Sequence, residues 1–371
     1  MSGYIVFLSA FAISFLLVPL VMSLANSSGA VAHPGRRHIH SHPTPKCGGV
    51  AIALGVLLLS PFIFPIDKVI GSYLLSSAVM LFLGILDDVR GADWKVKMVF
   101  SAIATTVFIF GSDIWISNIG DLFGFGEIHL GDWGIPFTFI AVFGIVNAIN
   151  LIDGLNGLAC GVSSIAFVAF AVFAFMSGNS TVLYLSLCCL GATLGLFRYN
   201  YPRARIFMGD SGTMFIGFSI AIMSILLTHG EGGISPMVPV IILAVPIYDT
   251  LRVFVIRVMN KRSPFAGDKT HLHHLMMRSG IKQNRVVKIV WILSALMSGI
   301  AVVFFRVDDW VLLVIFCSII VSLGIFVRNL RIIRARTERA NSRQEPFLNI
   351  RNLPVEENHP VLGKEEHGGA L

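Results

Sequence analysis

The stretch Asn147-Ala-Ile-Asn150-Leu-Ile-Asp153-Gly154-Leu-Asn156-Gly157 places one carboxylate and three amides between two long apolar runs, 135–146 and 158–176. Polar groups at the end of an apolar run are costly unless they meet water, a metal or a ligand. On an ideal helix, steps of three residues turn each polar side chain by ~60° from the last, so Asn147 and Asn156 would face opposite ways. We therefore expect the helix to loosen near Gly154, with the polar groups lining one pocket. The alternative is a polar hairpin between two membrane helices.

The composition indicates an all-α polytopic membrane protein. Of 371 residues, 55% are hydrophobic and only 13% are charged, and the mean hydropathy is +0.79. The five cysteines form no CxxC pair, which argues against a disulfide or zinc framework and indicates a reduced setting. We expect the lipid bilayer as a partner and no nucleic acid, and a homodimer stays an open alternative.

A helix that crosses a bilayer needs ~20 mainly apolar residues, and fewer where it is short or tilted. The first apolar run contains Pro19 and has no small-residue cleavage site, so we interpret it as a span and not as a signal peptide. Eleven candidate spans follow from the apolar runs, namely 3–24, 48–64, 69–86, 98–112, 135–150, 157–176, 180–197, 211–228, 236–256, 287–305 and 309–327.

The charges indicate how these spans are oriented. When the loops are assigned alternately to two sides, one side holds 26 of the 28 Lys and Arg residues, and the other holds only Lys68 and Arg306. The positive-inside rule then predicts an outer N-terminus and a cytoplasmic C-terminus. We predict one transmembrane catalytic domain over 1–328 and a basic, partly disordered cytoplasmic tail over 329–371. The outer loop 113–134 could hold a short hairpin.

Two acidic clusters fall at predicted cytoplasmic ends of spans. Asp87 and Asp88 end the third span, where they suit a metal or a general base, or only solvate a helix end. Adjacent residues point ~100° apart on a helix, so the two need not share one ligand. Asp210 lies in Met208-Gly209-Asp210-Ser211-Gly212, where an apolar run begins. There it could be a helix N-cap, or hold a divalent ion that bridges phosphates.

Two basic loops share this side. The segment 252–288 contains nine Lys and Arg residues and the run His271-Leu-His273-His274. It lacks the Cys or Glu that a zinc site would need. It suits a phosphate-rich ligand, or merely anionic lipid. The first loop, from Arg36 to Gly49, carries Lys46 and is either another phosphate contact or a positive-inside anchor. Acids beside basic loops on one membrane face are typical of phosphoryl transfer between a cytoplasmic polyanion and a membrane-held group.

Five motifs occur in order along the chain: Pro43-x-Pro45-x-x-Gly48-Gly49, Asp87-Asp88, the 147–157 stretch, Met208-Gly209-Asp210-Ser211-Gly212 and His271-x-His273-His274. In this combination, the residues from Arg36 to about Gly280 resemble the polyprenyl-phosphate N-acetylhexosamine-1-phosphate transferases (glycosyltransferase family 4). The histidine motif is similar to the WecA and TagO branch, and the run of three histidines of the MraY branch is missing. Asn156 stands where some WecA-like proteins have Asp, and His33-Pro34 stands where Asp-Pro is expected.

The resemblance implies roles for these residues. Asp87 would be the base or would activate the lipid phosphate, and Asp88 would assist in positioning. Asp210 would bind Mg²⁺, or Mn²⁺, with Asn150 as a second candidate ligand. The remaining candidates would bind substrate. Phe207 would stack on uracil, and the phosphates would be contacted by Lys95, Lys97 and Lys46. The nucleotide sugar would be held by Asp153, Asn156, His271, His273 and His274.

The expected function is therefore transfer of GlcNAc-1-phosphate from UDP-GlcNAc to undecaprenyl phosphate at the cytoplasmic face of a bacterial inner membrane. The product, undecaprenyl-diphosphate-GlcNAc, would begin a cell-surface polysaccharide such as lipopolysaccharide. Another UDP-HexNAc donor is the first alternative, and direct attack and a covalent aspartyl-phosphate both stay open. An ion-coupled transporter is the alternative from another class, although its acids would be expected at mid-span.

Overall fold

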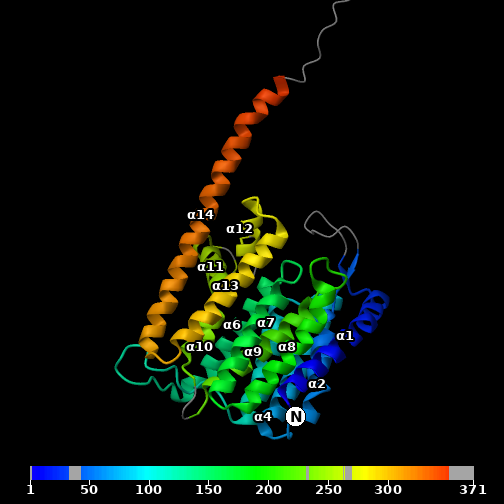
Figure 1. Cartoon of the computed structure of the whole chain (residues 1–371), viewed down its shortest axis with the longest axis vertical. Helices are drawn as coiled ribbons and strands as arrows, with labels where there is room; N and C mark the ends of the chain where they lie inside the picture. Colours follow the sequence, from blue (N-terminus) through cyan, green and yellow to red (C-terminus); the bar gives the residue numbers. More distant parts are fainter. Residues whose placement is uncertain (1, 33–42, 231–233, 262, 264–269, 351–371) are drawn as a thin grey trace, which may run out of the picture.

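The computed structural model describes residues 2–32, 43–230, 234–261, 263 and 270–350, and beyond Ile332 it describes the backbone alone. The described residues form a bundle of helices with one two-stranded antiparallel sheet and one 3-10 turn (Figure 1). The elements are α1 (Gly3–Ser28), β1 (Val31–Ala32), β2 (Thr44–Pro45), α2 (Gly48–Leu57), α3 (Ser60–Ile63), α4 (Lys68–Arg90), α5 (Trp94–Ser112), η1 (Gly131–Trp133), α6 (Gly134–Ile152), α7 (Leu158–Met176), α8 (Ser180–Asn200), α9 (Gly209–Thr228), α10 (Met237–Ile242), α11 (Ala244–Met259), α12 (Leu272–Arg278), α13 (Gln283–Phe304) and α14 (Asp309–Ile350).

Among the described residues, nine helices are long and apolar enough to cross a membrane, which confirms a polytopic membrane protein. Two of the eleven predicted spans are broken instead of continuous. The predicted span 48–64 is divided into α2 and α3, and Pro61 lies in the first turn of α3. The other is divided at Leu243 into α10 and α11. Pro246 has no N–H for the carbonyl of residue 242, so the helical ladder cannot continue unbroken there.

Helix α9 lies at the centre of the bundle and is packed by α2, α4, α6, α7 and α8 (Figure 1). Of its 18-residue apolar segment, 94% is buried inside the bundle, whereas only 22% of the corresponding segment of α14 at the periphery is buried. A helix that is apolar on all sides is expected in such a central position. Because α9 begins at Gly209, its polar first turn is carried into the middle of the bundle end where α4 and α6 finish.

Glycines let α2 and α4 approach the first turn of α9 closely. A Cβ on Gly49 would lie 2.6 Å from the carbonyl carbon of Ser211, and a Cβ on Gly84 would lie 2.6 Å from the amide nitrogen of Ser211. Both distances are far below van der Waals contact, and the obstacle is backbone that cannot rotate away. Small residues at helix crossings allow this kind of close packing in membrane proteins.

Gly49→Ala is expected to destabilise the protein by about 1–3 kcal/mol, because the added methyl group forces α2 away from α9. The measurement is the midpoint temperature of the detergent-solubilised protein, followed by fluorescence-detected gel filtration. Gly144→Ala is the matched control, because a Cβ there meets no atom within 4 Å. Equal midpoints for the two variants would contradict the close packing of α2 on α9.

The two ends of the bundle differ. At one end, residues 113–134 contain a short pairing, with Ile119 N–H donating to Ile128 O at 3.2 Å and an isolated bridge between Asn118 and His129. This agrees with the hairpin expected in that loop. Helix α14 continues without interruption to Ile350 and extends beyond the bundle at the other end (Figure 1). Residues 351–371 of the predicted tail lie outside the described part.

Candidate active site

The site is organised around the first turn of α9. Gly209 has a left-handed φ of +73°, and Met208 is the N-cap without a side-chain capping bond. Asp88 of α4 supplies that cap instead: its two oxygens accept the N–H groups of Asp210 at 2.9 Å and Ser211 at 3.0 Å. Asp210 is therefore not the N-cap of α9, which was one of the two interpretations of its sequence position. With both oxygens used by backbone, Asp88 is suited to positioning Asp210 and not to binding a ligand.

The carboxylate of Asp210 contacts two polar side chains, Asn150 and Lys97. Its Oδ1 accepts a short hydrogen bond from Asn150 Nδ2, and it lies 3.5 Å from the ammonium of Lys97. Lys97 also forms a closer ion pair with Asp87. Three helices thus deliver one cation and two carboxylates to one place: α4 ends there, α5 begins there, and α9 begins there. Asp87 accepts the N–H of Ala92 at 2.7 Å, so it points away from Asp88, as the ~100° turn between helix neighbours predicts.

The expected loosening of the helix near Gly154 is confirmed, since α6 ends at Ile152 and α7 begins at Leu158. Asp153 in this turn is half-buried. Burial, together with the negative charges of Asp210 and Asp88, raises its pKa to about 7. Asn156 turns elsewhere, and its amide donates to Pro202 O at 3.4 Å. The polar residues of the stretch therefore do not all line one pocket.

Asn200 holds this turn and was not identified from the sequence. Its Oδ1 accepts the N–H of Gly157 at 2.7 Å, and its Nδ2 donates to Ile206 O at 2.9 Å. The side chain is 3% exposed. It thereby ties the turn before α7 to the segment before α9. Only its place, at the end of an apolar run beside Tyr201-Pro202, distinguishes Asn200 in the sequence.

The first loop joins the site through backbone bonds to Phe207. Phe207 N–H donates to Pro45 O at 2.9 Å, and Gly48 N–H donates to Phe207 O at 3.0 Å. These bonds fix the backbone that carries the half-buried Phe207 ring. Lys46 is half-buried in the same loop, and its N–H donates to Ala30 O at 2.9 Å. The basic residues of this loop that precede Pro43 lie outside the described part.

The histidine motif, which is distant in the sequence, contacts the turn 153–157 through His273. His273 is 2% exposed, and a Cβ on Gly154 would clash with its Nε2. The described residues give neither ring nitrogen of His273 a hydrogen-bond partner. Burial, and then the neighbouring His274, lower the pKa of His273 to about 3. The ring is therefore neutral, and its centroid lies 4.3 Å from that of the half-buried His274.

Lys95 is another predicted site residue that lies away from the polar cluster. It is exposed, and its ammonium lies 5.8 Å from the centre of the Trp94 ring. Two residues span ~200° of a helix, so Lys95 and Lys97 face nearly opposite ways on α5. Of the two lysines predicted to contact phosphates, only Lys97 lies beside the carboxylates.

Within the described residues, no group of three or more His, Cys, Asp or Glu side chains is arranged to hold a metal ion. The donors present still fit Mg²⁺, which commonly binds through one or two carboxylates and completes its shell with substrate phosphates and water. Asp210 is 32% exposed at its side chain and so can receive such a shell. Turning the amide of Asn150 by 180° would present its oxygen to the same cation.

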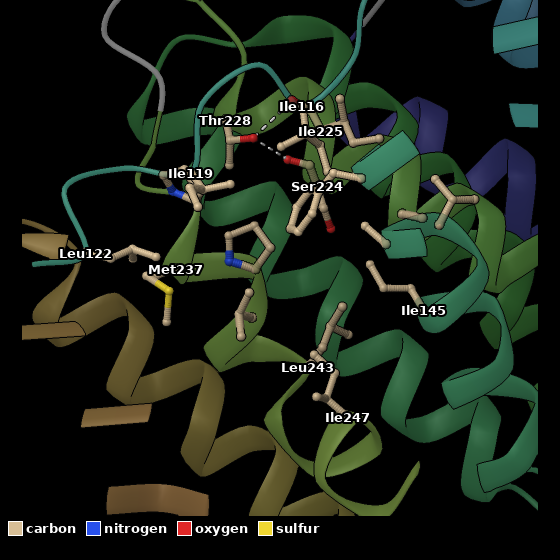
Figure 2. Close-up of a pocket in the computed structure, with 17 residues that line it drawn as sticks. Ile116, Ile119, Leu122, Ile145, Ser224, Ile225, Thr228, Met237, Leu243 and Ile247 are labelled. Carbon is tan, nitrogen blue, oxygen red and sulfur yellow. Dashed lines mark hydrogen bonds between the residues drawn. The ribbon is translucent and has the colours of Figure 1, made fainter. Parts of the chain in front are cut away.

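An apolar cavity of about 240 Å³ lies in the other half of the bundle, between α6, α9, α10 and the loop 113–134 (Figure 2). Ser224 and Thr228 line it, and both hydroxyls donate to carbonyls of their own helix. Ala221, another lining residue, is eleven positions after Asp210 and thus ~16 Å along the helix. The cavity is suited to an apolar chain and contributes no group to the polar cluster.

Comparison with known proteins accounts for this combination of residues. The model of glycosyl transferase family 4 matches residues 70–228, from α4 to the end of α9. A Bacillus subtilis (strain 168) protein named "Probable undecaprenyl-phosphate N-acetylglucosaminyl 1-phosphate transferase" is 32% identical over 94% of this chain and 97% of its own length. The chain belongs to glycosyl transferase family 4.

Further relatives of this family 4 protein agree with the assignment. The undecaprenyl-phosphate alpha-N-acetylglucosaminyl 1-phosphate transferase of Salmonella typhi is 29% identical over 83% of the chain and 86% of its own length. The Escherichia coli (strain K12) protein of the same name is 28% identical with the same coverage. The family match includes Asp87, Lys97, Asn150 and Asp210. These relatives are similar over most of the chain and not only over that segment.

Proposed function

We propose that this protein transfers GlcNAc-1-phosphate from UDP-GlcNAc to undecaprenyl phosphate, which gives undecaprenyl-diphosphate-GlcNAc and UMP. The names of the relatives in Bacillus subtilis, Salmonella typhi and Escherichia coli support this reaction. The observation that carries the proposal is the convergence of Asp87, Lys97, Asn150 and Asp210 where four spanning helices end or begin. A polar cluster at the end of a bundle can meet both a water-borne nucleotide and a lipid headgroup.

We place this end of the bundle at the cytoplasmic face of a bacterial inner membrane. The distribution of Lys and Arg supports this orientation, because 26 of 28 fall on the side of the polar cluster. It requires the broken pairs α2–α3 and α10–α11 to cross as well, which gives eleven crossings with the N-terminus outside. The product would enter the first lipid-linked step of a cell-surface polysaccharide, of the lipopolysaccharide type or related.

In this proposal Lys97 attracts the phosphates of both substrates, and Asp87 orients the phosphate of the lipid. An oxygen of that phosphate forms a bond to the β-phosphorus of UDP-GlcNAc. The bond from the β-phosphorus to the bridging oxygen breaks, and its electron pair leaves with UMP. The lipid phosphate is already ionised near neutral pH, so Asp87 contributes orientation more than proton removal. A route through an aspartyl-phosphate on Asp87 is the alternative.

Asp210 and Asn150 would hold a divalent cation, Mg²⁺ or Mn²⁺. When bound, the cation would neutralise the charge that develops on the leaving UMP. Asp88 keeps Asp210 in place through the backbone of α9. Phe207 would stack on uracil. The histidine motif and Asp153 would hold the nucleotide sugar from the side of the 153–157 turn.

The donor sugar is tested with membranes that contain this protein and a polyprenyl-phosphate extract. We expect ¹⁴C label from UDP-GlcNAc in the lipid fraction, sensitive to EDTA and to tunicamycin. Label from UDP-GalNAc but not from UDP-GlcNAc would keep the reaction and change the sugar. Transfer from no nucleotide sugar by folded protein would favour the ion-coupled transporter. The positions of Asp87 and Asp210 argue against a transporter, since both lie at helix ends and not at mid-span.

A further inference from the structure

Helix α11 carries a buried carboxylate that the proposed reaction does not use. Asp249 is 3% exposed, and three groups donate to it. Its Oδ1 accepts the N–H of Leu272 at 2.7 Å and Nη2 of Arg252 at 3.1 Å. Its Oδ2 lies 2.9 Å from Nδ1 of His271. Because the other two donors engage Oδ1, Oδ2 is dedicated to the imidazole ring.

His271 links Asp249 to the site. Its ring stacks on that of His273 with an interplanar angle of 10° and a centroid distance of 5.9 Å. His273 in turn lies against Gly154, in the turn that carries Asp153. Asp249 engages Nδ1 of His271, which leaves Nε2 on the opposite side of the ring.

A carboxylate can only accept, so it fixes the proton of His271 on Nδ1. Nε2 on the other side of the ring is then the nitrogen that can meet a ligand. A hydroxyl group of a nucleotide sugar both donates and accepts hydrogen bonds, so it can pair with this nitrogen.

We propose that Asp249 is a positioning residue for nucleotide-sugar binding: it holds His271 so that Nε2 forms a hydrogen bond with a hydroxyl group of the bound nucleotide sugar. This inference rests on the proposed transfer function for the identity of the ligand. It assigns to α11 a role that acts entirely through His271.

Asp249→Asn tests the tautomer directly. Leu272 and Arg252 both donate to Oδ1, so the amide oxygen stays with them and the NH₂ group is turned to His271. Nδ1 must then accept, and a neutral amide replaces the charged partner that orients the ring, so His271 is held less firmly toward the ligand. We expect the KM for UDP-GlcNAc to rise about tenfold or more, which is the size of effect seen when a metal-binding histidine loses the carboxylate that orients it. The KM for the polyprenyl phosphate should stay unchanged.

A double-mutant cycle separates positioning from stability. His271→Phe keeps a ring on His273 but has no nitrogen, and we expect it to raise the KM for UDP-GlcNAc by a similar factor. In that background, Asp249→Asn should raise the KM no further, because it acts only through His271. Additive effects on KM would overturn the proposal. If Asp249→Asn does not fold, a normal KM in folded His271→Phe would overturn it equally.

Ser279→Ala is the matched control. Its hydroxyl bonds Leu330 O at 3.1 Å and so anchors the opposite end of α12 to α14. We expect this variant to loosen α12 without changing the KM for UDP-GlcNAc. A tenfold rise of that KM in Ser279→Ala would show that Asp249 acts only by anchoring α12. Dissociation constants of UDP-GlcNAc for the purified variants provide a readout besides activity. Absence of binding and transfer in the wild-type protein would reject the proposed function itself, whereas wild-type values in Asp249→Asn would reject only this inference.

Discussion

Asp210→Asn is expected to lower the rate of sugar-1-phosphate transfer by about 10²–10³-fold or more, because it removes the carboxylate proposed to hold the divalent cation. The amide has the same shape, so the packing of α9 should persist. Asp88 would still accept the two backbone N–H groups of the first turn. The measurement is the initial rate in detergent at saturating UDP-GlcNAc, with Mg²⁺ varied over a wide range. We expect the remaining activity to require more Mg²⁺ than the wild type does.

Asp132→Asn is the control for this variant, because Asp132 is exposed in the outer loop, far from α9 along the chain. It should show wild-type rates and the same dependence on Mg²⁺. Near-normal turnover by purified Asp210→Asn would remove Asp210 as the metal ligand and with it the centre of the proposed site.

Asp87→Asn is expected to reduce the rate by about 10²-fold, since the lipid phosphate would lose the group that orients it. The substitution also breaks the ion pair with Lys97. Lys97 would then pair with Asp210 alone and compete there with the cation. The measurement is the rate at saturating concentrations of both substrates, together with the yield of folded protein from membranes.

The control for this second variant is Asp113→Asn at the opposite end of the bundle. Asp113 also pairs with a lysine, Lys68, at 3.2 Å, but both side chains are exposed there. An exposed pair contributes little, so both rate and stability should stay at wild-type values. If Asp87→Asn kept the wild-type rate, neither orientation nor the aspartyl-phosphate route could depend on Asp87.

The helices, and the residues of the polar cluster around Asp210, could be predicted from the sequence. Apolar runs of spanning length predicted eleven spans, and nine of these are continuous helices among the described residues. The run 236–256 has the same composition, but a proline near its middle interrupts the backbone ladder and divides it into α10 and α11. Composition alone does not record that break.

The details of the site depended on contacts between distant segments. Asp87 and Asp88 are neighbours in the sequence, yet one faces Lys97 and the other caps α9. Asn200 and Asp249 bind backbone and side-chain groups of other loops, so no local pattern marks them. Lys95 and Lys97 resemble each other in the sequence, and only the helical phase of α5 separates them.

The most direct test of the central claim follows the two phosphates of the donor separately. UDP-GlcNAc labelled with ³²P in the β-phosphate is incubated with purified protein, polyprenyl phosphate and Mg²⁺, and a parallel sample carries the label in the α-phosphate. Transfer of GlcNAc-1-phosphate predicts β-label in the lipid and α-label in released UMP. Retention of both labels in water-soluble UDP, with sugar alone in the lipid or no transfer at all, would contradict the account.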